Sequence, residues 1–193
     1  MSIEAALEEF PKEIELRSGL TCVLRVLEAA DELPLHEFFS SLPPPELLFL
    51  KHHVTDPAVL RDWCANIDLD RNFPLLAMAN GRLLGIATLH QQLGGWKRHI
   101  GRVSVLVHPA YRQRGLARRL VLELIDAARQ DGLEKVEAEF IGKQEGAIKM
   151  FGLLGFGTLM RLPDYVRDMQ AVRHDYVLMG LDLATDEEYA GMG

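Results

Sequence analysis

The stretch VSVLVHPAYRQRGLARRLVLELIDAARQD, residues 103–131, decides the fold. Its first part is rich in β-branched residues and stops at His108-Pro109, because proline removes a backbone donor and favours extended geometry in the residue before it. From Leu116 onward apolar residues recur at intervals of three and four, which places them on one face of a helix. They are Leu116, Ala117, Leu120, Val121, Leu124, Ile125 and Ala128. The stretch therefore predicts a strand, a polar turn and a helix that ends near Gly132.

The turn between this strand and helix has the composition of an anion-binding site. The first turn of a helix carries N–H groups without internal partners, and the helix dipole adds positive potential there. Gly115 has no Cβ, so a bulky anion can approach the backbone. Four arginines crowd the turn, although the chain as a whole is acidic. They are Arg112, Arg114, Arg118 and Arg119. These features predict a ligand that bears phosphate.

Length and composition restrict the class of protein. The 193 residues, 48% of them hydrophobic, predict a single domain over 1–193, with an N-terminal extension at 1–17 and a flexible acidic tail at 184–193. A net charge of −7 argues against nucleic acid or an anionic membrane surface as partner. No apolar run reaches the length of a signal peptide or a membrane span. Cys22 and Cys64 are expected to be reduced thiols, no metal-ligand spacing occurs, and a cytoplasmic location is expected.

The region before this stretch predicts strands and short helices. A strand is expected at 21–27, a helix at 31–42 capped by Asp31, a short helix at 46–53, and another after Asp56-Pro57. Asn80-Gly81 is a strong hairpin signal and joins predicted strands at 75–79 and 83–90. Gly85 within the second strand indicates a bulge or a close approach of another segment.

The region after the long helix alternates in polarity and then changes period. Val136, Ala138 and Phe140 alternate with Glu137 and Glu139, so 134–141 is predicted as a strand with carboxylates on one face. A helix is expected at 144–154, and strands are expected at 156–162 and 175–183. The polar segment 163–174 between them is expected to be a loop near the active cleft.

The central turn reads R-x-x-G-x-A and resembles the acyl-CoA-binding signature R/Q-x-x-G-x-G/A of the GNAT superfamily of N-acyltransferases. The resemblance implies an α/β fold of three layers, with a mostly antiparallel central sheet splayed at the CoA site and helices on both faces. It also implies acetyl-CoA as cosubstrate, with its pyrophosphate on the turn and its pantetheine along the preceding strand. The binding residues implied are Leu106, Val107, Arg112, Gln113, Arg114, Gly115, Leu116, Ala117 and Arg118.

A second segment extends the resemblance, because GNAT chains commonly carry N-x-x-A-x-x-x-Y-x-x-x-G-F after the strand that follows the central helix. That pattern stands here as Gln144, Ala147, Phe151, Gly155 and Phe156. Gln144 keeps a carboxamide that can hydrogen-bond pantetheine or backbone. Phe151 replaces the tyrosine whose hydroxyl lies near the thioester sulfur in the family, so an aromatic wall is expected without the usual general acid. The resemblance thus adds Gln144, Ala147 and Phe151 to the implied cofactor site.

In GNAT enzymes that acetylate protein N-termini, a strand glutamate twelve positions before that tyrosine resembles a general base, and here the position is Glu139. A base is needed because an amine at neutral pH is mostly ammonium and has no lone pair for attack. Burial beside Phe140 and Phe151 is expected to raise the pKa of Glu139. The alternatives for the base are Glu137, His108, Asp164 or a chain of water molecules.

The function expected from this resemblance is transfer of an acetyl group from acetyl-CoA to a primary amine by direct attack in a ternary complex. The acceptor is a protein lysine, a protein N-terminus or a small-molecule amine. No cysteine is positioned for an acyl-enzyme. The alternative is a non-catalytic acyl-CoA-binding sensor whose proton chemistry has lapsed with Phe151. The oligomeric state stays open, with a homodimer among the alternatives.

Overall fold

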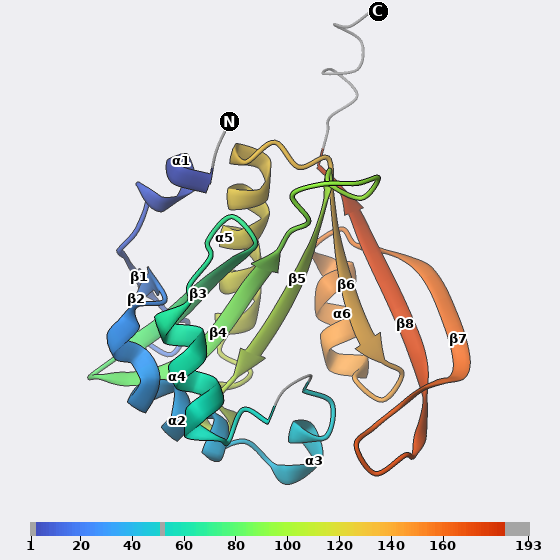
Figure 1. Cartoon of the computed structure of the whole chain (residues 1–193), viewed down its shortest axis with the longest axis horizontal. Helices are drawn as coiled ribbons and strands as arrows, with labels where there is room; N and C mark the ends of the chain where they lie inside the picture. Colours follow the sequence, from blue (N-terminus) through green and yellow to red (C-terminus); the bar gives the residue numbers. More distant parts are fainter. Residues whose placement is uncertain (1–2, 51–52, 184–193) are drawn as a thin grey trace, which may run out of the picture.

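A computed structural model describes residues 3–50 and 53–183 of the chain (Figure 1). The helices are α1 Ile3–Leu7, η1 Ala29–Asp31, α2 Glu32–Ser40, α3 Pro44–Leu47, α4 Pro57–Ala65, η2 Pro109–Tyr111, α5 Leu116–Gln130 and α6 Glu145–Leu153. The strands are β1 Lys12–Glu15, β2 Thr21–Val26, β3 Asn72–Ala79, β4 Arg82–His90, β5 Ile100–Val107, β6 Lys135–Ile141, β7 Gly157–Arg167 and β8 Arg173–Asp182. Among the described residues no helix is long and apolar enough to cross a membrane.

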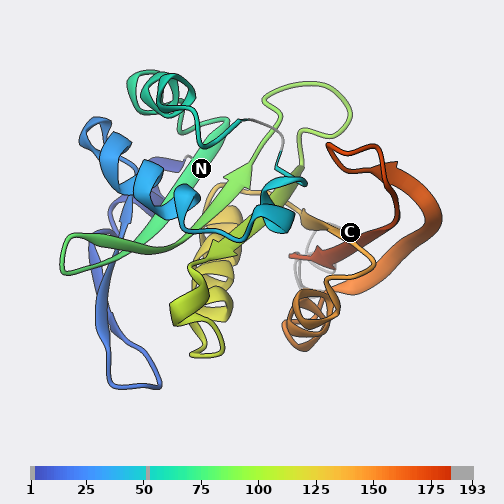
Figure 2. The ribbon, with the colours of Figure 1, turned by 90° about the horizontal axis from the view of Figure 1, so that it is seen from below.

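The strands form one sheet in the order β1-β2-β3-β4-β5-β6-β8-β7 within the described ranges. Every neighbouring pair is antiparallel except β5 with β6, which run parallel because α5 crosses over between them. Helices α5 and α6 lie on one side of the sheet, away from α2 and α4 (Figure 2). The mixed α/β fold with a mostly antiparallel sheet and helices on both faces is confirmed.

Two hydrophobic clusters hold the three layers together. The larger one joins α1, α5 and α6 to one face of the sheet, and the smaller one joins α2 and α4 to the other face of β3 and β4. Alternation along β4 explains the division, since Ile86 belongs to the smaller cluster and its neighbour Ala87 to the larger one. Cys22 and Cys64 lie in different clusters, and both thiols are free.

The turns predicted from short-range signals are present. Asn80 and Gly81 both have positive φ, 50° and 73°, as a two-residue hairpin between β3 and β4 requires. Gly132 closes α5 with a φ of 84°. The ladder slips between Ala77 and Met78, opposite the start of β4, so the irregularity expected near Gly85 is also present.

Two predicted elements differ from the structure. The helix expected at 46–53 is α3, which starts earlier at Pro44 and ends at Leu47; residues 51–52 lie outside the described ranges. The loop expected at 163–174 is mostly strand, because β7 runs on to Arg167 and β8 begins at Arg173. Asp168 makes this long hairpin possible, since its carboxylate accepts hydrogen bonds from the backbone N–H groups of Gln170 and Val172 in the turn.

The described part of the segment assigned to an N-terminal extension contributes α1 and β1 to the domain. Ile3, Ala6, Ile14 and Leu16 are buried in the larger cluster. Lys12 of β1 donates to the buried carboxylate of Glu123 on α5 at 3.0 Å. The four-residue strand was missed because it is too short for its alternation to stand out. The tail expected at 184–193 lies outside the described residues.

Asp31 serves a different purpose from the predicted helix cap. Its carboxylate makes no cap hydrogen bond to α2 and is 3% exposed as a residue. It accepts instead from both guanidinium nitrogens of Arg25 on β2, at 2.7 and 2.5 Å, and from the backbone N–H of Glu28. A buried carboxylate needs such partners, so Asp31 ties the first turn of α2 to the sheet.

Close packing of α5 on β4 depends on Gly85. A Cβ at Gly85 would lie 3.1 Å from the backbone oxygen of Leu106 and 3.3 Å from side-chain atoms of Leu116 and Leu120. We expect Gly85→Ala to lower the free energy of unfolding by about 1–3 kcal/mol, measured by urea denaturation, because a backbone atom cannot move aside cheaply.

Gly146 is the matched control for this prediction. It lies in α6, and a Cβ there would meet nothing within 4 Å. Gly146→Ala should therefore raise the free energy of unfolding by roughly 0.5 kcal/mol, as expected for alanine in a helix. Equal effects of the two substitutions would contradict the proposed close approach at Gly85.

Candidate functional site

The parallel ladder between β5 and β6 is short and marks the centre of the site. Ile100, Gly101 and Arg102 pair with Lys135, Val136 and Glu137, and no further rung is present although both strands continue for several residues. Strand β5 stays paired with β4 up to Val107, and β6 stays paired with β8 up to Ile141. The two halves of the sheet therefore separate beyond Arg102 and Glu137. The expected splay of the sheet occurs between these two strands.

The predicted strand, turn and helix stand at the wide end of the splay. Strand β5 ends at Val107, η2 follows, and Gly115 directly precedes α5 with a φ of 85°. A φ in this region suits glycine, because a Cβ would be strained there. The surroundings are open, since the nearest atoms to a Cβ at Gly115 would be Cδ and Nε of Arg17 at 3.9 Å. The first N–H groups of α5 thus face an accessible space lined by cations.

Arg112 pairs with a carboxylate and with a backbone oxygen. Its two terminal nitrogens donate to both carboxylate oxygens of Glu46 on α3, at 2.8 and 2.7 Å, and its Nε donates to the backbone oxygen of Val107 at 3.0 Å. Arg119 forms an ion pair with Glu123 at 2.6 Å. The guanidinium of Arg114 lies over the ring of Tyr111, and Arg118 is exposed. Arg112 thus connects α3 to the turn, and its contact with a phosphate stays a prediction.

Arg17 is a cation near this turn that sequence reasoning missed. It lies in the turn between β1 and β2, about a hundred positions before Gly115 in the chain. Only the pairing of β1 at the edge of the sheet brings it close, so no local pattern could have indicated it.

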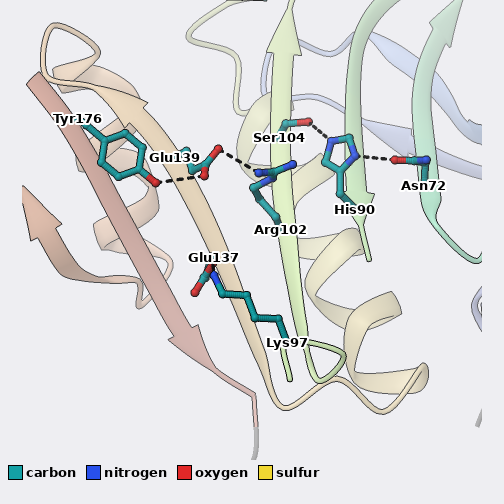
Figure 3. A network of polar contacts seen from close by, with 8 residues as sticks. All are labelled: Asn72, His90, Lys97, Arg102, Ser104, Glu137, Glu139 and Tyr176. Carbon is teal, nitrogen blue, oxygen red and sulfur yellow. Dashed lines mark hydrogen bonds and ion pairs between the residues drawn. The ribbon is translucent and has the colours of Figure 1, made fainter. Parts of the chain in front are cut away.

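A row of polar side chains crosses the open face of the sheet at the narrow end of the splay (Figure 3). Arg102 of β5 donates to Glu139 of β6 at 3.2 Å, and the hydroxyl of Tyr176 on β8 donates to the other carboxylate oxygen at 3.1 Å. Nζ of Lys97 lies 3.9 Å from the carboxylate of Glu137. These side chains come from three strands and one loop, so the fold assembles them.

The same row continues onto β4 and β3. The ring of His90 hydrogen-bonds with Asn72 at 2.7 Å and with Ser104 at 3.2 Å, as Figure 3 shows. A cleft lies over the closed end of the splay. We call it the apex pocket; its polar lining is His90, Gln91, Gln92, Lys97, Arg102, Glu137 and Glu139.

Glu139 does not have the surroundings expected from the sequence. Phe140 is buried in the core, whereas the neighbouring Glu139 points to the opposite face, where its side chain is 38% exposed. Adjacent residues of a strand face opposite sides, and that alternation overrides their proximity in sequence. The expected burial of Glu139 against Phe140 and Phe151 is therefore wrong.

Phe151 is a core residue. It is 1% exposed and packs between the rings of Phe140 and Phe156, with ring centroids 4.9 Å away on each side. The ring therefore fills the space under β6, and its role as an aromatic wall of the cofactor site stays a prediction. Gln144 precedes α6, and its Oε1 accepts from the backbone N–H of Ile141 at 2.9 Å. Ala147 of α6 is partly buried against the core.

Of the other candidate bases, His108 and Asp164 have their partners outside this row, whereas Glu137 belongs to it. Nδ1 of His108 accepts from the backbone N–H of Ala110, and burial together with the charges of Arg112 and Arg82 lowers the pKa of His108. Asp164 lies in β7 with a φ of 53°, and its backbone N–H donates to Asp175. Glu137 shares the open face with Glu139 and is 19% exposed. The geometry favours Glu139 and Glu137 over the other two.

Tyr176 is the hydroxyl that sequence reasoning missed. Burial, the charge of Glu139 and the hydrogen bond to it raise the pKa of Tyr176 to about 12. The phenol is thus protonated at neutral pH and remains a donor to Glu139. The alternation in residues 174–181 indicated only a strand. The contact between Tyr176 and Glu139 depends on the register of β8 against β6, which sets Tyr176 opposite Ile141.

Comparison with known proteins agrees with this geometry. The sequence profile of the Acetyltransferase (GNAT) family matches residues 34–156, and the chain belongs to that family. It is 32% identical over 84 residues to the L-methionine sulfoximine/L-methionine sulfone acetyltransferase of Salmonella typhimurium and 31% identical over 84 residues to the L-amino acid N-acyltransferase MnaT of Escherichia coli. Each alignment covers 41% of this chain and 49% of the relative, so the chain spans about half the length of the curated relatives it matches.

Solved structures share the fold over most of the chain. A candidate acetyltransferase from Salmonella typhimurium, solved with its cofactor acetyl-CoA, superposes with a TM-score of 0.72 at 24% identity and covers 85% of this chain and 95% of its own. A ribosomal-protein-S5-alanine acetyltransferase from Vibrio fischeri superposes with a TM-score of 0.74 at 17% identity, over 89% of this chain and 96% of its own. At these identities the likeness shows the fold.

The contact between Tyr176 and Glu139 can be tested by spectroscopy. Glu139→Gln removes a negative charge and should lower the pKa of Tyr176 from about 12 toward the ordinary value of 10.0. The measurement is the pH titration of tyrosinate absorbance, taken as the difference between each protein and its Tyr176→Phe counterpart. An unchanged titration in Glu139→Gln would show that the two side chains do not interact in solution.

Proposed function

We propose that the protein transfers an acetyl group from acetyl-CoA to a primary amine by direct attack within a ternary complex. The observation that carries this proposal is the arrangement of the splay, with the Gly115 turn and helix start at its wide end and Glu139 at its closed end. An extended arm held by its phosphates at the turn would run between β5 and β6 toward Arg102 and Glu139. A reactive group at the end of that arm would reach the apex pocket.

The residues at the wide end fit a CoA pyrophosphate. The open surroundings of Gly115 leave its backbone accessible, and the start of α5 supplies N–H donors and positive potential. Gln113, Leu116 and Ala117 provide further backbone in this turn, and the exposed Arg118 provides charge. Arg114 and Arg17 add to the local positive potential. The ladder between β5 and β6 ends at Arg102, so the backbone groups of Leu106 and Val107 that face β6 are not paired with it. These backbone groups could therefore pair with pantetheine.

The residues at the closed end can accept the proton that the acceptor amine loses. When bound, acetyl-CoA supplies the thioester carbonyl. The amine nitrogen bonds to this carbonyl carbon, the carbon–sulfur bond breaks, and sulfur leaves as thiolate. Glu139 accepts a proton from the amine, either directly or through water, while Arg102 and Tyr176 hold its two carboxylate oxygens. The thiolate needs no dedicated acid, because a thiol pKa near about 8.5 makes protonation helpful rather than necessary.

The acceptor remains to be chosen among amine classes. The two curated relatives are named for L-amino acids and for methionine sulfoximine or sulfone, whereas the S5-alanine enzyme is named for a ribosomal protein. A non-catalytic acyl-CoA sensor is the rival function. It was suggested by Phe151, but the structure places a hydroxyl beside Glu139 from another strand. Turnover of an amine separates the two functions, because both predict CoA binding.

Gly115 provides the first test of this proposal. Gly115→Val should abolish CoA binding in calorimetry, since the side chain would both strain the left-handed backbone and cover the turn. Gly81→Val is the matched control, because Gly81 has a similar φ of 73° but lies in the β3–β4 turn. Loss of CoA affinity in both variants would indicate general damage, and retained affinity in a folded Gly115→Val protein would place the pyrophosphate elsewhere.

Glu139 provides the second test. Glu139→Gln keeps the shape of the side chain and removes its basicity, so turnover should fall by on the order of a hundredfold while CoA affinity changes little. The measurement is the rate of thiol release from acetyl-CoA with an accepted amine, across the pH range. Glu137→Gln is the comparison on the same strand face. A hundredfold loss in Glu137→Gln with full activity in Glu139→Gln would transfer the role of base to Glu137.

A further inference from the structure

The apex pocket contains both signs of charge in equal number. Lys97 and Arg102 are its cations, and Glu137 and Glu139 are its carboxylates. Each cation lies beside one carboxylate, Arg102 at 3.2 Å from Glu139 and Lys97 at 3.9 Å from Glu137. The pocket is therefore dipolar, with no excess of either sign among these four groups. A purely cationic acceptor such as a polyamine would offer no negative charge to Lys97 and Arg102.

These ion pairs can exchange partners with a ligand. The side chains of Arg102 and Glu139 are 37% and 38% exposed, and that of Lys97 is 46% exposed. Exposed pairs of this kind contribute little to stability, so a ligand charge can replace one member at small cost. The separation of 3.9 Å between Lys97 and Glu137 is at the outer limit of an ion pair. Lys97 is thus available to a ligand anion.

Gln91 supplies an independent sign of an anionic group. Its Nε2 is buried and has no hydrogen-bond partner among the described residues, although the residue lines the pocket. A buried amide donor without a partner is costly. An acceptor oxygen from a ligand would satisfy it. Gln91 and Lys97 belong to the segment between β4 and β5, so both donors come from one side of the pocket.

We propose that the acceptor carries a carboxylate next to its amine, as a free α-amino acid does. The carboxylate lies on Lys97, Arg102 and the amide of Gln91, and the amine lies toward Glu139. Arg102 and Glu139 lie 3.2 Å apart. Their spacing therefore suits a ligand whose carboxylate and amine are attached to the same carbon atom. This inference rests on the proposed function and deepens it. It selects free amino acids over protein N-termini and protein lysines, which offer no carboxylate beside the amine.

The first experiment compares acceptors that differ only at the carboxylate. The probes are leucine, methionine and phenylalanine, each with its amide, its decarboxylated amine and a short peptide beginning with the same residue. The free acid should have a kcat/KM at least about tenfold above its amide and amine, as expected for one charge-assisted contact. The test is stringent, because the ammonium of an amide is the more acidic and deprotonation alone favours the amide.

The second experiment assigns the preference to Lys97. Lys97→Met should reduce the ratio of kcat/KM between the free acid and its amide by about tenfold, mainly through KM for the acid, and Lys97→Arg should restore most of it. Arg98→Met is the matched control, because Arg98 is an exposed cation of the same loop that lies outside the pocket lining. The control should keep the ratio of the parent protein.

The outcomes separate this inference from the proposed function. Amides or peptides that are acetylated as well as the free acids would overturn the inference and leave the acetyltransferase in place. A ratio that falls equally in Lys97→Met and Arg98→Met would also overturn it, since general charge rather than the pocket would then decide. Tight binding of acetyl-CoA without turnover of any amine would overturn the proposed function and the inference with it.

Discussion

The structure depends on one constraint, the early end of the parallel ladder between β5 and β6. Helix α5 connects the two strands, so they must run parallel, and three rungs join them before they separate. Everything proposed for the function uses this geometry. The wide end receives the start of α5, and the closed end gathers side chains from both halves of the sheet. If the two strands were paired along their whole length, the backbone groups of β5 would all be occupied by β6. The cleft at the closed end would then be absent.

Packing beneath the sheet differs between its two halves. On the β4 side, Gly85 allows Leu116 and Leu120 of α5 to approach the strands closely. On the β6 side, the rings of Phe140, Phe151 and Phe156 pack edge to face in the core. The β4 half thus packs on α5 through leucine side chains that approach the backbone at Gly85, and the β6 half is packed through aromatic rings.

Sequence reasoning predicted the local parts of this design and missed the parts that depend on distant segments. The strand–turn–helix around Gly115 and the Asn80-Gly81 hairpin follow from short-range signals, and both are present. The pairing of Arg112 with Glu46 joins residues far apart in the chain, so a motif that contains Arg112 cannot reveal it. Strand β1 and the extended β7–β8 hairpin gain their stability from neighbouring strands rather than from their own pattern. Glu139 was predicted as the base from its position in the sequence, but its partners Arg102 and Tyr176 depend on register across three strands.

Phenylalanine at position 151, where the family commonly has tyrosine, is consistent with one apolar and one polar face of β6. A hydroxyl at position 151 would be enclosed by Phe140 and Phe156, and a buried hydroxyl without a partner is destabilising. Phenylalanine keeps that face apolar and lets α6 pack against β6. The polar groups then collect on the opposite face, where Tyr176 offers its hydroxyl to Glu139 and solvent can exchange protons with the pair. In this chain the proposed proton chemistry and the aromatic core therefore lie on opposite sides of β6, and loss of the family's tyrosine does not by itself imply loss of activity.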